Sequence, residues 1–277
     1  MALADADYRV LRTREERLAF ARSMNLFSTP FMRVVFKDEK ATRYVLRILT
    51  GKPDLQIQEN LTEYRISKLD TKDAVLDVIA VDEKGVFYHI EIQLANSDDH
   101  IRRVRFYSAM VDSELLEKGT KYTDLPNTYI FYISMDDFMG LGEPIAQVES
   151  TIGKKKKTYE DEKHIFYVNA GVDDESEVAR LMNFFKLADP NDSSHGELSD
   201  RVHLLKCEKE GEEPMCEVAL CQRRSPFGLL LIGSGYLFSS GANSTLFRNA
   251  STVLTSSSLT ASFPPPGNTS TSISWLM

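Results

Sequence analysis

The sequence predicts a mixed α/β domain with an antiparallel β-hairpin near its centre, and three observations support this. Residues 74–94 (AVLDVIAVDEKGVFYHIEIQL) read as two short strands around a polar, glycine-containing loop. Apolar residues recur with a helical period on both sides of this hairpin, at 39–49 and 96–118. Two further apolar and aromatic segments, 128–134 and 164–170, are typical of strands.

The composition is that of an ordinary globular protein. The chain has 277 residues, 42% hydrophobic and 27% charged, enough for one large domain or two smaller ones. Its net charge of −8 argues against a protein that coats nucleic acid, although an enzyme that contacts DNA in a single cleft can be acidic overall. The three cysteines have neither a disulfide pattern nor a zinc-binding spacing.

No segment has the character of a secretion signal or a membrane span. The N-terminal residues lack the apolar core of a signal peptide, and the longest apolar run, 227–232, is far too short to cross a bilayer. We therefore expect a cytoplasmic protein without membrane contact. Its oligomeric state stays open.

Helical and extended segments precede the hairpin. Residues 1–24 are charged and are either helical or frayed. Asp38 is suited to cap a helix over 39–49, which Gly51 would end. Residues 55–73 then read as a strand or extended segment followed by a polar loop.

A long helix and further elements follow the hairpin. The segment 96–118 reads as one helix, with cap candidates at Asn96–Asp99 and a stop at Gly119. Four lysines at 154–157 indicate a solvated hairpin tip, and 176–187 has the pattern of another helix.

The C-terminal part of the chain differs sharply from the rest. Residues 219–277 hold 3 of the 33 basic and none of the 41 acidic residues, and 19 of these 59 positions are Ser or Thr. This segment is either a low-complexity tail or the product of a slipped reading frame, and we favour the second. We therefore divide the chain into an N-terminal extension (1–26), a main domain (27–218) and a low-charge tail that is disordered or frameshift-derived.

Two acidic residues stand inside the apolar strands of the hairpin. Asp77 and Glu91 each lie between two apolar neighbours, and a carboxylate buried in this way needs a partner. Adjacent strands lie about 4.8 Å apart, so both carboxylates can point at one cation. Gln93 projects from the same face as Glu91, whereas we place His89 on the opposite face as a packing or surface residue.

Such a pair suits a metal site for phosphodiester hydrolysis. Mg²⁺ prefers hard oxygen ligands, polarises phosphoryl oxygens and lowers the pKa of its bound water. Asp77, Glu91 and the carbonyl of Ile92 could hold the ion, with Gln93 orienting the water. Alternatively, the acids form a structural pair, each satisfied by a nearby cation such as Arg103.

Several blocks then occur in a recognisable order. The central block, 69–93, contains Asp77 in its first strand and ends in YHIEIQ. The other parts are FMRVVFKDEKATRYVLRIL at 31–49, Arg103 and Tyr107 four residues apart, and GTKYTDLPNTYIFYISMDDF at 119–138. This set resembles the PD-(D/E)XK nucleases, and more narrowly the Rpn-like recombination-promoting nucleases called PD-(D/E)XK nuclease family transposases. The family has Tyr-Asn-Ile-Glu-Met-Gln where this chain has YHIEIQ.

The resemblance covers residues 27–218 and implies a restriction-endonuclease-like mixed sheet with a central hairpin flanked by helices. It implies an Mg²⁺-dependent endonuclease, with Mn²⁺ as a possible substitute, that acts on double-stranded DNA in mobile-element recombination. Asp77 and Glu91 would bind the metal and form the catalytic set with Gln93, which stands where the wider superfamily has lysine. The residues expected at the phosphate or the DNA are Arg103, Lys72 and Tyr107.

Structural rather than functional interpretations of these residues stay open. Tyr107 could be a packed aromatic side chain, Lys72 a solvated one, and Glu63 an exposed strand residue rather than an accessory ligand. The whole chain could be a catalytically inactive DNA-binding or regulatory relic of the same fold. It could also be a protein without nucleic-acid function whose acidic pair is structural.

Overall fold

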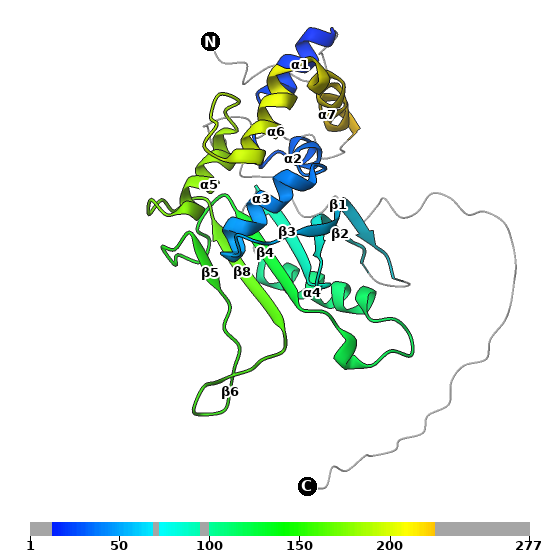
Figure 1. Ribbon diagram of the computed structural model, residues 1–277, viewed down its shortest axis with the longest axis vertical. Helices are drawn as coiled ribbons and strands as arrows, with labels where there is room; N and C mark the ends of the chain where they lie inside the picture. The colour runs from blue at the N-terminus through cyan, green and yellow to red at the C-terminus, as the bar shows by residue number, and fades with distance from the viewer. Residues whose placement is uncertain (1–12, 69–71, 95–99, 225–277) are drawn as a thin grey trace, which may run out of the picture. The chain divides into compact units, whose positions relative to one another are not determined.

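A six-stranded mixed sheet lies at the centre of the computed structural model, which describes residues 13–68, 72–94 and 100–224 (Figure 1). Its order is β1-β2-β3-β4-β8-β5. The strands are β1 Ile57–Ile66, β2 Ala74–Asp82, β3 Phe87–Gln93, β4 Thr128–Ser134, β5 Ile145–Gln147 and β8 Lys163–Asn169. Neighbouring strands are antiparallel from β1 to β3, parallel from β3 through β4 to β8, and antiparallel between β8 and β5. The predicted fold class is confirmed.

Helices cover both faces of this sheet (Figure 1). They are α1 Arg14–Arg22, α2 Thr29–Val35, α3 Glu39–Thr50, α4 His100–Leu115, α5 Glu177–Leu187, α6 Gly196–Cys207 and α7 Glu212–Arg224, with short 3₁₀ turns η3 Tyr122–Asp124 and η4 Lys209–Gly211. Val104, Met110 and Val111 of α4 pack on one face. The other helices form the larger core with Val78, Ile90 and their neighbours on the opposite face.

The predicted hairpin is present as β2 and β3, and its turn is closed by Asp82. One carboxylate oxygen, Oδ1, accepts the backbone N–H groups of Lys84 at 2.8 Å and Val86 at 2.9 Å. The other, Oδ2, accepts the Tyr88 hydroxyl at 3.0 Å. A local side chain thus supplies the acceptors that a four-residue loop leaves missing.

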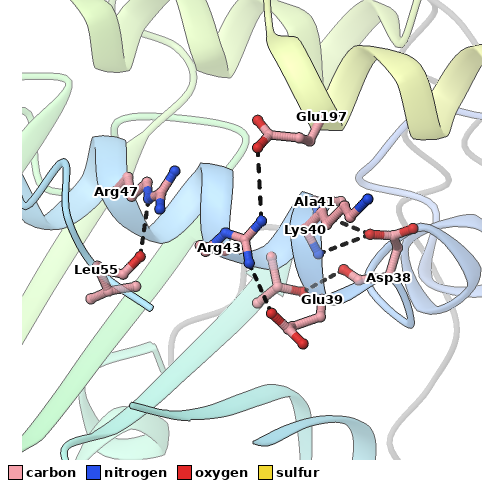
Figure 2. A network of polar contacts seen from close by, with 9 residues as sticks. Asp38, Glu39, Lys40, Ala41, Arg43, Arg47, Leu55 and Glu197 are labelled. Atoms are coloured by element: carbon pink, nitrogen blue, oxygen red, sulfur yellow. Dashed lines mark hydrogen bonds and ion pairs between the residues drawn. The ribbon is translucent and has the colours of Figure 1, made fainter. Parts of the chain in front are cut away.

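Helix α3 begins and ends where the sequence predicts. The Asp38 side chain accepts the N–H groups of Lys40 and Ala41 at 2.8 and 3.2 Å, as Figure 2 shows. The helix ends at Gly51, whose φ of 64° is the left-handed conformation that glycine adopts without strain. Arg43 on the same helix forms an ion pair with Glu39 at 2.9 Å.

The helix predicted at 96–118 is α4, with different ends. It is described from His100, so the cap candidates Asn96–Asp99 lie outside the described residues. It ends at Leu115 rather than at Gly119, because the chain turns at Glu117, whose carbonyl accepts both the N–H and the hydroxyl of Thr120.

Helices from the two ends of the described chain lie together. Arg14 of α1 forms an ion pair with Glu212 of α7 at 2.7 Å. The backbone of α7 continues to Arg224, beyond the change of composition at residue 219. The boundaries of the three predicted segments stay predictions. Among the described residues, no helix is both long and apolar enough to span a membrane.

Candidate active site

The site forms where strands β2 and β3 separate. Their backbone pairing reaches only as far as Val78 opposite Ile90. Beyond this point the Asp77 side chain replaces the backbone as acceptor, and its Oδ2 accepts the Ile92 N–H at 2.9 Å. Asp77 therefore bridges the fork between the strands and remains partly exposed.

The fork coincides with a kink in the neighbouring strand pair. Leu76 and Ile79 pack into the same apolar cluster although three positions separate them, so the strict alternation of faces breaks between them. Glu63 of β1 lies opposite Asp77, between the register pairs that flank them, and has a φ of 56°. The left-handed backbone conformation of Glu63 explains the break in alternation, because one such residue changes the direction of the strand.

Glu91 lies on β3 and is 4% exposed. Its Oε2 is 3.3 Å from Nε2 of His89, which is fully buried. The prediction that His89 faces away from Glu91 is therefore wrong. Residues two apart in a strand share a face, so His89, Glu91 and Gln93 project together toward α4.

Burial leaves several polar atoms of this group unpaired. Among the described residues, Oε2 of Glu91 and both ring nitrogens of His89 are buried and have no hydrogen-bond partner. An unsatisfied buried polar atom costs roughly 1–3 kcal/mol, so unpaired atoms on two adjacent side chains favour a further group binding here.

The electrostatics agree with this. Burial, and then the nearby Glu91, raises the pKa of Asp77 to about 7. Burial raises the pKa of Glu91 to about 8, against the opposing charge of Arg103. Burial also lowers the pKa of His89 to about 4, so the imidazole is neutral at physiological pH. Without a cation the pair thus resists ionisation, which is the behaviour expected of metal-binding carboxylates when no metal is bound.

The donor set fits a hard divalent cation with few protein ligands. Asp77 and Glu91 supply two carboxylates from neighbouring strands, and one oxygen of Glu91 has no partner. Across the described ranges, no cluster of three or more His, Cys, Asp or Glu side chains is suited to a metal. An ion here would therefore take its other ligands from backbone carbonyls, water or substrate, which is the usual pattern for Mg²⁺.

Helix α4 brings two of the predicted residues to this face of the sheet. Arg103 donates from Nη1 to Oε1 of Gln93 at 2.8 Å, and its charge opposes the rise in the pKa of Glu91. The Tyr107 ring lies 6.0 Å from the His89 ring and packs beside the apolar cluster around Met110. The structure thus places Arg103 near Glu91 with Gln93 bonded to it, and Tyr107 beside His89.

Lys72 and Glu63 occupy different positions. Lys72 is exposed at the start of the hairpin, and no contact with either acid is seen in the described structure. The Glu63 side chain, 45% exposed, forms an ion pair with Arg33 of α2 at 2.7 Å. The four lysines at 154–157 lie at the tip of the small hairpin β6 Thr151–Ile152 and β7 Lys157–Thr158.

Two residues near the acids were not recognised from the sequence as site residues. His89 could have been found, because the two-residue period of the strand already pairs it with Glu91. Arg33 could not, because nothing in the sequence indicates that α2 and β1 meet there.

Comparison with known proteins gives one match. The family model for PD-(D/E)XK nuclease family transposases matches residues 48–184. This segment runs from the end of α3 to α5 and contains both acids, His89, Gln93, Arg103 and Tyr107. Searches of curated proteins and of solved structures returned no match.

Proposed function

Because residues 48–184 belong to the PD-(D/E)XK nuclease family transposases, we propose that the chain is a divalent-metal-dependent endonuclease. It hydrolyses phosphodiester bonds of double-stranded DNA and acts in mobile-element recombination. The observation that supports this best is the pair of acids at the β2–β3 fork, Glu91 buried and Asp77 partly exposed, both with raised pKa values and one with an unpartnered oxygen.

Asp77 and Glu91 would hold the metal, which we propose is Mg²⁺, with Mn²⁺ able to replace it. When bound, the ion supplies Lewis acidity toward the phosphoryl oxygens and a lowered pKa for water. Asp77 keeps its carboxylate at the fork by accepting the Ile92 N–H. Neutral His89 lies against the Oε2 side of Glu91 and limits where that carboxylate can turn.

Gln93 and Arg103 form the polar edge of the site. The Gln93 amide accepts from Arg103 through Oε1. We propose that Gln93 orients the attacking water and that Arg103 binds the scissile phosphate. Tyr107 supports His89 by ring packing, and Lys72 contacts the DNA backbone outside the site.

Plasmid nicking in the presence of Mg²⁺ or Mn²⁺ tests this proposal. Asp77→Asn and Glu91→Gln should each lower the cleavage rate by at least about 100-fold, because each removes a charged ligand without changing shape. Both acids favour the neutral form without metal, so the amides should fold normally, which thermal melting checks. Asp54→Asn, at an exposed acid, is the matched control.

The other outcomes are distinct. Cleavage that survives both substitutions would reject the assigned roles. Salt-sensitive DNA binding by the wild type without any metal-dependent cleavage would instead identify an inactive relic. Wild-type protein that neither binds DNA nor responds to Mn²⁺ in calorimetry would make the acids a structural pair. Against that last alternative, neither acid forms an ion pair with Lys or Arg within the described residues.

A further inference from the structure

Arg33 lies next to the acid pair but comes from outside the segment that the family model matches. It is on α2, and its Nη2 is 2.7 Å from Oε1 of Glu63. Its Nε is buried without a hydrogen-bond partner, while the side chain as a whole is 30% exposed. The stem is therefore fixed and part of the guanidinium reaches solvent.

The residue that holds Arg33 is itself placed beside Asp77. Glu63 faces Asp77 across the β1–β2 pair, between Thr62 opposite Val78 and Tyr64 opposite Leu76. Its φ of 56° costs roughly 1–2 kcal/mol for a residue with a side chain. Strained backbone of this kind persists where the surrounding structure fixes it, often at functional sites. The charge of Arg33 also acts to lower the pKa of Asp77, which agrees with this proximity.

A cation beside a metal site needs an explanation, because it repels the metal. Within the described part of the chain, Glu63 is the one ion-pair partner of Arg33. A guanidinium has five N–H donors in a planar fork, which matches the oxygens of a phosphate. Donors that Glu63 does not use, on a partly exposed side chain held beside Asp77, suit an anionic ligand better than they suit a structural role.

Building on the proposed function, we propose that Arg33 binds a phosphate of the DNA backbone beside the Asp77–Glu91 pair, with Glu63 holding its guanidinium in position. Arg33 and Arg103 then approach the acids from α2 and α4, which cover opposite faces of the sheet. The DNA backbone would thus be contacted from both layers at the fork.

The test measures DNA binding and metal binding separately. Fluorescence anisotropy with a labelled duplex in Ca²⁺ follows DNA affinity, and calorimetry with Mn²⁺ alone follows the metal. Arg33→Met should weaken DNA binding about 10-fold and lower its salt dependence by about one ion, because one phosphate contact is lost. Affinity for Mn²⁺ should stay equal or increase, because a repelling charge is removed.

Further variants separate this role from a structural one. Arg33→Lys should recover part of the affinity, and Glu63→Gln, which keeps the Arg33 charge but loosens it, should weaken DNA binding about 3-fold. Arg43→Met is the matched control, because Arg43 is also paired with a glutamate yet makes its ion pairs with α3 and α6 (Figure 2). Its DNA affinity should match the wild type.

Three results would overturn the inference. If Arg33→Met binds DNA as tightly as Arg43→Met, Arg33 does not contact phosphate. If Arg33→Met loses Mn²⁺ affinity and thermal stability together with DNA affinity, Arg33 is structural. Wild-type protein that fails to bind DNA overturns the proposed function itself and this inference with it, which distinguishes that failure from the first two.

Discussion

At the scale of single residues, the site is defined by the energy of charging two neighbouring acids, Glu91 buried and Asp77 partly exposed. Asp77 and Glu91 both have raised pKa values because burial disfavours their charged forms, and Asp77 also because Glu91 is near. If these acids bind a metal as proposed, a proton and a divalent cation compete for the same carboxylates. His89 stays neutral and does not compensate them at physiological pH.

This competition predicts how stability depends on pH without metal. The unfolded acids ionise near pH 4, whereas the folded ones hold their protons up to about pH 7 and 8, so the folded state binds more protons between these values. From pH 6.5 to 8, His89 is neutral in the folded state and at most half protonated in the unfolded state, which offsets only a small part of the acid effect. The free energy of unfolding should therefore fall by about 2 kcal/mol over this range. Urea denaturation in EDTA measures this.

Two controls belong to that experiment. Glu91→Gln should remove most of the pH slope, since one titrating group is gone. Added Mn²⁺ should stabilise the wild type more at pH 8 than at pH 6.5, because fewer protons must be displaced. A slope that is unchanged in Glu91→Gln would contradict the assignment of the raised pKa to this acid.

Only part of this residue-level picture could be predicted from the sequence. Asp77 and Glu91 stood out because an acid between apolar strand residues needs a partner, which is a local signal. The face of His89 was predicted wrongly although the two-residue period determines it. Arg33 left no signal, because its neighbour Glu63 is thirty residues away and its approach to Asp77 depends on how α2 packs.

At the scale of elements, the hairpin is held by its own side chains. Asp82 is nearly buried and accepts from Lys84, Val86 and Tyr88. This closes the turn and fixes the register of β2 against β3, so that Asp77 meets Ile92 at the fork. The geometry of the acid pair therefore depends on a residue at the other end of the hairpin.

Removing that anchor should destabilise the protein measurably. Asp82→Ala leaves the buried Tyr88 hydroxyl and two partly buried backbone N–H groups without an acceptor, and we expect a loss of about 2–4 kcal/mol in the free energy of unfolding. Tyr88→Phe removes a single hydrogen bond and should cost about 1 kcal/mol. Urea denaturation compares the two. Equal effects of both substitutions would show that the turn contacts contribute little.

At the scale of the molecule, the acid pair and the lysine-rich hairpin lie at opposite ends of the parallel strands. The acids lie toward the C-terminal ends of β3 and β4, where Glu91 is opposite Tyr132. The lysine-tipped hairpin β6–β7 leads into the N-terminal end of β8, at the opposite end of these parallel strands (Figure 1). The hairpin is thus placed to meet solvent or a distant part of a long ligand rather than Asp77 and Glu91.

The described core also predicts where the chain can be shortened. Helix α7 packs against α1 and α2, and buried residues reach at least Ala219. A chain that ends at Arg224 should melt within about 2 °C of the full-length protein and match it in the proposed DNA cleavage, since the core is retained. A chain that ends at Glu210 should lose cooperative unfolding in thermal melts. Impaired folding of the chain that ends at Arg224 would contradict the proposed tail boundary.

The sequence by itself determined the hairpin, the cap of α3, the fold class and the two acids, because each depends on periodicity or on contacts between near neighbours. The tertiary structure decided which distant residues join them. Burial raises the pKa values at the fork, Glu63 in a left-handed conformation breaks the strand alternation beside Asp77, and helix packing brings Arg33 near Asp77 and Arg103 near Glu91. Such long-range contacts arise from the packing of whole elements, which no local pattern records.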